Sequence, residues 1–291
     1  MMNRLSGTGV ALVTPFTRSL EIDFEALGRL MDYTQSNGVD YYVVMGTTGE
    51  TATLSPAEKA AVLNFVRENN RANLPIVYGL GGNNTAALLS ELKNTELSGI
   101  DALLSVSPYY NKPSQRGIVA HYEQLANEAP IPVILYNVPG RTASNVTAAS
   151  TLILAHHPNI IGIKEAAGDM DQVMRIARDK PEDFLLISGD DLLTLPMMSV
   201  GGTGVISVLA NAIPNTFQRM MTEFRAGNVQ GAALTSYEML DLNPLMYEES
   251  NPVGVKFVLS ELGICEPHVR LPLFEASESL KARIREILHK M

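Results

Sequence analysis

The chain has 291 residues, of which 46% are hydrophobic and 18% are charged, so it can bury one large core or two modest ones. The formal net charge of -9, without a basic cluster to set against it, excludes nucleic acid and anionic membrane as expected partners and favours a small molecule. The single cysteine, Cys265, excludes an internal disulfide and fits a reducing compartment. The N-terminal residues lack an apolar segment of signal-peptide length, and no later run approaches the roughly 20 residues of a membrane span. We therefore expect a cytoplasmic protein.

Short apolar runs alternate with longer amphipathic ones along the chain. Runs with strand character cover 8–13, 39–45, 75–78, 100–106, 131–137, 160–164, 184–188 and 204–208. Helical periodicity follows them at 24–37, 56–70, 85–98, 115–128, 147–156, 170–178, 192–200 and 214–226. Eight strand–helix units predict an α/β fold, a closed (β/α)8 TIM barrel, over residues 1–226. Further helical patterns at 229–242, 253–262 and 276–290 predict a C-terminal helical region over residues 227–291.

The run at 160–164 is the most informative of the eight strands. Its isoleucines predict a strand buried on both faces, and Lys164 ends it. A charged ammonium is costly to bury there, so this amine should lose its proton more readily than a surface lysine does. A neutral amine is a nucleophile toward carbonyl groups. From this stretch alone, a lysine that extends to solvent at the strand end is an equally good interpretation.

Functional residues of such barrels lie just after the strands, at their C-terminal ends. In this chain those positions carry the sequences GTTGE at 46–50, SPYYN at 107–111, NVPGRT at 137–142 and SGDD at 188–191. A lysine, several phenols, two hydroxyls and an arginine are therefore expected on one rim. The members with useful chemistry are Thr47, Thr48, Tyr110, Tyr136, Arg141 and Lys164.

Each rim residue also has an ordinary structural interpretation. Thr47 and Thr48, between glycines, could hold a small carboxylate or could simply bond the local backbone. Tyr136 could be a core tyrosine, or a proton carrier in a hydrogen-bonded relay for which Thr48 and Tyr110 are candidates, because an isolated phenol has a pKa of about 10. Arg141 is by default a surface arginine, and on this rim it could bind a second carboxylate.

Three other chemistries fit the sequence less well. A metal-dependent aldolase needs rim ligands, but every histidine falls in a predicted helix or in the C-terminal region: His121, His156, His157, His268 and His289. A phosphate-binding barrel would use the loops after strands seven and eight, whereas the glycines at 201–204 precede strand eight. A barrel that only binds a ligand would not need Lys164. We therefore do not expect metal catalysis.

Six motifs in order resemble the dihydrodipicolinate synthase family. They are GTTGE at 46–50, SPYYNKP at 107–113, YNVPGRT at 136–142, GIKEA at 162–166, SGDD at 188–191 and GVISV at 204–208, with NPVGVK at 251–256 in the C-terminal region. The resemblance implies a lyase, 4-hydroxy-tetrahydrodipicolinate synthase, that condenses pyruvate with L-aspartate 4-semialdehyde in diaminopimelate and lysine biosynthesis. It also implies a cytoplasmic homotetramer without a cofactor.

The same resemblance assigns roles residue by residue. Lys164 would form the Schiff base with pyruvate and Tyr136 would carry protons, while Thr48 and Tyr110 would complete the relay, Tyr110 from a neighbouring subunit. Arg141 would bind the semialdehyde carboxylate. Positions that surround the substrate in the family match Thr47, Thr48, Gly189 and Ile206. The alternative is a sister lyase for N-acetylneuraminate or a 2-keto-3-deoxy sugar acid, and Arg141 within YNVPGRT favours the synthase.

The chain departs from the feedback-inhibited members of that family. Two histidines and a glutamate of their lysine pocket are matched here by Pro56, Lys59 and Ala87. Loss of an acidic partner and gain of a positive charge predict weak or absent inhibition by L-lysine, unless an acidic side chain that the family does not use, such as Glu50, compensates.

Overall fold

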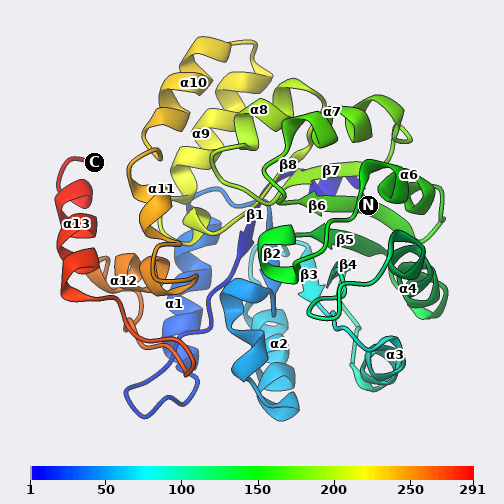
Figure 1. The fold of residues 1–291 in the computed structure, drawn as a ribbon. Helices are drawn as coiled ribbons and strands as arrows, with labels where there is room; N and C mark the ends of the chain where they lie inside the picture. Colours follow the sequence, from blue (N-terminus) through cyan, green and yellow to red (C-terminus); the bar gives the residue numbers. More distant parts are fainter. Residues whose placement is uncertain (1) are drawn as a thin grey trace. The chain divides into compact units, whose positions relative to one another are not determined.

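The computed structural model describes residues 2–291 (Figure 1). Parallel strands follow one another in sequence order around a closed barrel, which confirms the predicted (β/α)8 fold. The strands are β1 (Gly7–Ala11), β2 (Tyr41–Val44), β3 (Ile76–Gly79), β4 (Ala102–Val106), β5 (Val133–Asn137), β6 (Ile160–Glu165), β7 (Leu185–Ser188) and β8 (Gly204–Ser207). Each lies within a residue or two of an expected apolar run.

Helices fill the intervals between strands. They are α1 (Phe24–Ser36), α2 (Pro56–Asn69), α3 (Thr85–Asn94), α4 (Gln115–Glu128), α5 (Pro139–Thr142), α6 (Ala148–Ala155), α7 (Met170–Asp179), α8 (Thr194–Ser199) and α9 (Pro214–Arg225). Short 3-10 turns are η1 (Met2–Leu5), η2 (Thr47–Gly49), η3 (Thr51–Thr53) and η4 (Leu209–Asn211). After the barrel come α10 (Val229–Tyr237), α11 (Leu242–Leu245), α12 (Val253–Glu261) and α13 (Glu278–Leu288).

Two predicted helices were too long. The helix expected over 85–98 ends at Asn94, because the side chains of Asn94 and Thr95 bond back to the carbonyls of Ser90 and Glu91 and Thr95 is extended. The helix expected over 229–242 stops at Tyr237, and the next helix contains Pro244, which has no N–H to continue a helical ladder.

Two compact units make up the chain. One consists of residues 75–206 with the N-terminal residues up to Ser6, and the other of Gly7–Leu74 with Ser207–Met291. The boundary expected at residue 226 between barrel and C-terminal region stays a prediction, because helices on both sides of it belong to the second unit. Within that unit α9 and α10 pack closely against each other.

The first unit holds its strands together through close backbone approach at Gly162. An added Cβ at this position would lie 2.6 Å from Leu185 Cβ, the residue paired with it on β7. Only glycine therefore lets β6 and β7 pair at this point. This contact fixes the strand that carries Lys164, two residues further on.

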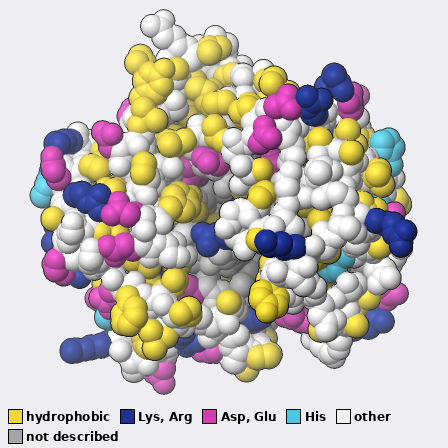
Figure 2. Space-filling view, viewed as in Figure 1, with side chains coloured by type: hydrophobic (Ala, Val, Ile, Leu, Met, Phe, Trp, Pro, Cys, Tyr) yellow, Lys and Arg dark blue, Asp and Glu magenta, His cyan; other side chains and the backbone are white. Residues whose placement is uncertain are grey.

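The C-terminal helices of the second unit expose part of their apolar surface. Figure 2 shows hydrophobic side chains gathered at the upper end of this face, where Figure 1 places α10. The exposed apolar residues of this helix and the following turn are Val229, Leu234, Tyr237 and Leu240. Among residues 2–291, no helix is both long and apolar enough to cross a membrane. The expected cytoplasmic location stays a prediction.

Candidate active site

Lys164 and Tyr136 lie opposite each other at the ends of neighbouring strands, β6 and β5. A register irregularity at Val133 and Ile134 produces this pairing; regular pairing from Val133 and Ile160 would instead place Ile163 opposite Tyr136. The Nζ atom of Lys164 lies 4.4 Å from the centre of the Tyr136 ring. Both residues are buried. The irregularity in the sheet therefore brings an amine and a phenol together.

The Lys164 amine has no charged partner within the described part of the chain. Its side chain is 6% exposed, and it forms no hydrogen bond or ion pair with another residue among 2–291. No partner among the described residues therefore competes with a carbonyl ligand for this amine, which is a potential nucleophile toward such a group.

Gly189, which directly follows β7, lies near the lysine in the first unit. An added Cβ at Gly189 would lie 3.0 Å from Lys164 Cε and 2.6 Å from Ala166 Cβ. The missing side chain thus leaves room for the lysine, and the Gly189 N–H donates to the Glu165 carbonyl at 2.8 Å. Ile206 is buried within β8.

Arg141 lies in α5, a four-residue helix that begins two residues after the end of β5. Its guanidinium is exposed and makes no ion pair with any residue that the structure describes. Pro139 starts the helix and Ala143 ends it in the left-handed conformation, with φ of 57°. This short helix presents a cation without a counter-ion, which suits the binding of an anion.

Tyr110 lies outside the packed core of the first unit. Its side chain is 86% exposed and its φ is 76°, in the left-handed region that non-glycine residues rarely occupy. Neighbouring Tyr109 accepts a hydrogen bond from Asn83 through its carbonyl at 3.2 Å. The chain therefore holds the Tyr110 backbone in an unusual conformation and leaves its phenol free of the core.

Thr47 and Thr48 form η2 in the second unit, directly after β2. Thr48 is buried, and its Oγ1 accepts a hydrogen bond from Asn251 Nδ2 at 3.0 Å. Since that oxygen already accepts, the Thr48 proton is available to another acceptor. The Gly49 carbonyl accepts from Thr14 Oγ1 at 2.7 Å. Asn251, from the NPVGVK motif, thus belongs with this loop.

A buried ion pair anchors the end of the threonine loop. Glu50, with φ of 53°, places its Oε1 2.5 Å from Lys256 Nζ, and the Lys256 side chain is 0% exposed. The ammonium also donates to the His268 carbonyl at 2.8 Å and lies 4.1 Å from the centre of the Phe16 ring. Burial lowers the pKa of Lys256, and the Glu50 carboxylate opposes that shift. The loop is therefore tied to α12.

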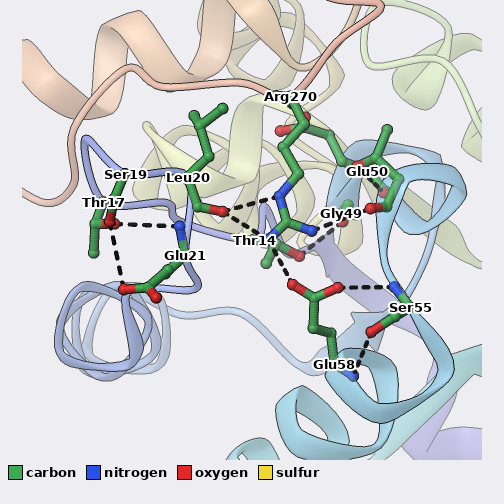
Figure 3. Close-up of polar contacts among 11 residues, drawn as sticks. Thr14, Thr17, Ser19, Leu20, Glu21, Gly49, Glu50, Ser55, Glu58 and Arg270 are labelled. Atoms are coloured by element: carbon green, nitrogen blue, oxygen red, sulfur yellow. Dashed lines mark hydrogen bonds and ion pairs between the residues drawn. The ribbon is translucent and has the colours of Figure 1, made fainter.

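Arg270 adds a second anchor to the same loop (Figure 3). Its backbone N–H donates to Glu50 Oε2 at 2.9 Å, and its guanidinium donates to the carbonyls of Leu20 and Thr53 and to Glu58 Oε1. Arg270 holds the pKa of Glu58 well below its usual range, at about 2, with help from the Ser55 N–H. One arginine thus joins the segments after β1 and β2 to the start of α2.

Metal ligands do not gather in the described part of the chain. Within residues 2–291 there is no group of three or more His, Cys, Asp or Glu side chains arranged to hold a metal ion. His121 is buried in α4, where its Nδ1 lies 2.8 Å from Thr85 Oγ1, and burial lowers its pKa. The single thiol, Cys265, is buried, which raises its pKa to about 11. Buried and protonated, this thiol is a poor nucleophile.

The rim residues could be predicted from the sequence, but the groups that hold them could not. Lys164, Tyr136, Arg141, Gly189 and Ile206 belong to the first unit, and Thr47 and Thr48 to the second. The sequence pattern did not predict the residues that anchor the rim residues. They are Asn137, Glu165, Glu50, Lys256, Asn251 and Arg270. Polar residues at strand ends beside predicted functional ones were the available signal for Asn137 and Glu165.

Comparison with known proteins gives matches over almost the whole chain. The sequence model of the dihydrodipicolinate synthetase family matches residues 4–291. A 4-hydroxy-tetrahydrodipicolinate synthase of Flavobacterium psychrophilum is 48% identical over 284 residues, covering 97% of each chain. The structure of the Acinetobacter baumannii dihydrodipicolinate synthase complexed with pyruvate matches with a TM-score of 0.94 and 34% identity, covering 98% of each chain.

A monomeric dihydrodipicolinate synthase variant matches with a TM-score of 0.96 and 35% identity, covering 99% of this chain and 97% of that one. The fold, the sequence and the paired Lys164 and Tyr136 all point to the same family. The chain belongs to the dihydrodipicolinate synthetase family.

Proposed function

We propose that this protein is a 4-hydroxy-tetrahydrodipicolinate synthase, which condenses pyruvate with L-aspartate 4-semialdehyde. The observation that carries the proposal is the buried Lys164 amine, without a charged partner among the described residues, 4.4 Å from the centre of the Tyr136 ring. The name and high identity of the Flavobacterium relative support it, as does the pyruvate complex of the Acinetobacter synthase.

In this proposal Lys164 attacks the keto carbon of pyruvate. The carbinolamine loses water to give an iminium ion, which withdraws electrons from the pyruvate methyl group. Loss of a methyl proton then gives an enamine. The enamine carbon bonds to the aldehyde carbon of the second substrate, and the aldehyde oxygen takes up a proton. Attack by the amino group of the second substrate on the iminium carbon closes the ring and releases Lys164 as an amine.

The other rim residues supply protons and binding contacts. Tyr136 carries protons to and from these intermediates, with Thr48 and Tyr110 completing its relay. Arg141 binds the carboxylate of the semialdehyde through its unpaired guanidinium. Thr47, Thr48, Gly189 and Ile206 match family positions that surround the bound substrate. No metal or organic cofactor takes part, because the iminium ion itself stabilises the carbanion-like enamine.

The test of the lysine is reductive trapping. Incubation with pyruvate and borohydride should attach the reduced three-carbon acid to Lys164, located by peptide mass spectrometry, and Lys164→Ala should abolish both adduct and activity. Labelling of Lys112 or Lys256 instead, or of no lysine, contradicts the mechanism. A parallel assay with N-acetylneuraminate and a 2-keto-3-deoxy sugar acid distinguishes the synthase from its sister lyases.

We further propose that the active form is a homo-oligomer, a tetramer by family resemblance, in which Tyr110 serves a neighbouring subunit. The 86% exposure of Tyr110 in the single chain supports this role. Mixing Tyr110→Phe subunits with Lys164→Ala subunits should restore part of the activity, since one site of a mixed pair keeps both groups. Mixed oligomers without rescue would refute a shared site.

Feedback control by L-lysine should be weak or absent. The positions Pro56, Lys59 and Ala87 offer no acidic partner for the ammonium group of the ligand, which should weaken binding by more than about tenfold. Saturable binding at micromolar lysine in a calorimetric titration, together with inhibition, would contradict this expectation.

A further inference from the structure

A second pair of residues lies directly behind the amine and the phenol. Asn137 follows Tyr136 and Glu165 follows Lys164, and these two residues are also opposite each other in the β5–β6 register. Successive side chains of a strand point to opposite faces, so this pair projects away from Lys164 and Tyr136. Both side chains are buried, and the proposed reaction uses neither of them.

The Glu165 carboxylate is held entirely by neutral donors. Asn137 Nδ2 lies 3.0 Å from each of its oxygens, Gln172 Nε2 lies 2.9 Å from Oε2, and the Ala167 N–H donates to Oε1 at 2.7 Å. Within residues 2–291 no lysine, arginine or histidine forms an ion pair with it. Burial raises the pKa of Glu165, while these hydrogen bonds oppose the shift.

Asn137 uses its remaining atoms on the segment that contains Arg141. Its Oδ1 accepts from the Val146 N–H at 2.9 Å, and its Nδ2 also donates to Asn145 Oδ1 at 2.7 Å. The chain therefore leaves β5 at Asn137, passes through α5 and returns to the side chain of the same asparagine. Asn145 in turn donates to Gln172 Oε1 at 2.8 Å, which closes a ring of amides around the carboxylate.

The carboxylate decides which way the Asn137 amide faces. An ionised carboxylate can only accept hydrogen bonds, so the Asn137 NH2 group must point to Glu165 and its carbonyl to the Val146 N–H. A neutral amide at position 165 could donate as well as accept, so the Val146 N–H alone would then favour the native orientation of the Asn137 side chain. The orientation of one side chain thus determines where the Arg141 segment closes.

We propose that Asn137 and Glu165 are positioning residues for the second substrate, holding the Arg141 segment in register with Tyr136 and Lys164. This rests on the proposed function, in which Arg141 binds the semialdehyde carboxylate. Glu165 touches neither substrate. Through Asn137 it determines the position of the Arg141 segment. The attack of Lys164 on pyruvate does not depend on it.

The test is steady-state kinetics on both substrates with the full-length enzyme. Glu165→Gln should raise the KM for aspartate semialdehyde roughly tenfold or more, because small displacements of a binding group are costly. The KM for pyruvate and the yield of the borohydride adduct at Lys164 should stay within about twofold. Equal rises in both KM values, or no rise in either, would overturn the proposal.

Asn137→Asp provides an independent variant with its own signature. Two carboxylates would then face each other, so semialdehyde binding should weaken at neutral pH and recover as the pH falls and the pair shares a proton. The double variant Asn137→Asp/Glu165→Gln again pairs one acid with one amide, with their positions exchanged. It should bind semialdehyde better than either single variant. A double variant no better than the single ones contradicts the orientation argument.

Two controls separate this inference from a general loss of structure. Asn159→Asp makes the same amide-to-acid change as Asn137→Asp, but just before the start of β6, far along the strand from Glu165. There the Asn159 amide donates to the carbonyls of Ala126 and Ala129, and the variant should leave the ratio of the two KM values unchanged. Arg141→Ala should itself raise the semialdehyde KM. If it does and Glu165→Gln does not, only the positioning role is wrong; if Arg141→Ala has no effect, the proposed binding role fails with it.

Discussion

Two buried glutamates, Glu50 and Glu165, each lie directly after residues of the candidate active site. Their carboxylates are stabilised in different ways. Glu50, after the threonine loop, faces the Lys256 ammonium and the Arg270 N–H. Glu165, after the reactive lysine, faces only amide groups of side chain and backbone. The first carboxylate is compensated by a full charge and the second by dipoles.

The difference also concerns distance along the chain. Glu50 and Lys256 are separated by 206 residues, whereas the side-chain donors to Glu165 are 28 and 7 residues away. Removing a charged partner leaves an unpaired buried charge, but removing one amide leaves the others in place. The threonine loop should therefore depend on remote contacts, of which the Lys256 charge is the strongest, and the lysine strand on several local ones.

The largest expected effect follows from removing the remote charge. Lys256→Met keeps an unbranched side chain one atom shorter and leaves the Glu50 carboxylate buried without its counter-ion, which should cost about 3–5 kcal/mol of unfolding free energy. Denaturant unfolding measures this loss. The matched control is Glu50→Gln/Lys256→Met, which removes both charges and should recover part of the stability. A double variant no more stable than Lys256→Met would contradict the charge argument.

A smaller loss of stability is expected for the amide-bound carboxylate. Glu165→Gln keeps the shape of the side chain but turns a donor toward the Asn137 and Gln172 amides, which should cost about 1–3 kcal/mol in the same unfolding experiment. A loss larger than that of Lys256→Met would reverse the comparison between the two glutamates.

The dependence of stability on pH sharpens the comparison. Burial raises the pKa of Glu165 above its ordinary value of 4.5, so the folded chain binds this proton more readily than the unfolded chain. Its contribution to stability is therefore fully present below that value and is lost as the pH rises through the raised pKa. The stability difference between the native chain and Glu165→Gln should be larger near pH 4 than near pH 7. Equal differences at both would contradict this.

The smallest effect on stability is expected at Glu58, and its dependence on pH is opposite to that of Glu165. Arg270 and Ser55 lower its pKa from 4.5 to about 2, so its contribution is present above 4.5 and lost as the pH falls through about 2. The side chain is 31% exposed, and Glu58→Gln should cost under about 1 kcal/mol at neutral pH. That difference should shrink in acid. Thermal unfolding of both chains between about pH 2 and 7 measures it.

Much of the barrel could be predicted because each strand is a short apolar run bounded by recognisable helix signals. Ser55 illustrates this, since it forms the expected capping box with Glu58 at the start of α2. Lys164 and Tyr136 stood out as polar residues at the ends of such runs. Their pairing did not, because it depends on a register irregularity that leaves no mark in the pattern of apolar residues.

The anchors could not be predicted for a different reason. Lys256 lies in a helical pattern where a lysine is ordinarily a surface residue, and only the packing around α12 reveals that all of its side chain is buried. Glu50 gives no local sign of its left-handed backbone or of a partner 206 residues away. Contacts of this kind depend on tertiary structure, which periodicity does not encode.

The separation of Glu50 from Lys256 also sets an order of events during synthesis on the ribosome. Residues 75–206 of the first unit emerge as one continuous stretch, but the second unit needs both ends of the chain. At about 5–20 residues per second, Glu50 waits roughly 10–40 s for Lys256 to be made. Throughout that interval its carboxylate must stay hydrated, so the threonine loop reaches its final conformation only when translation is almost complete.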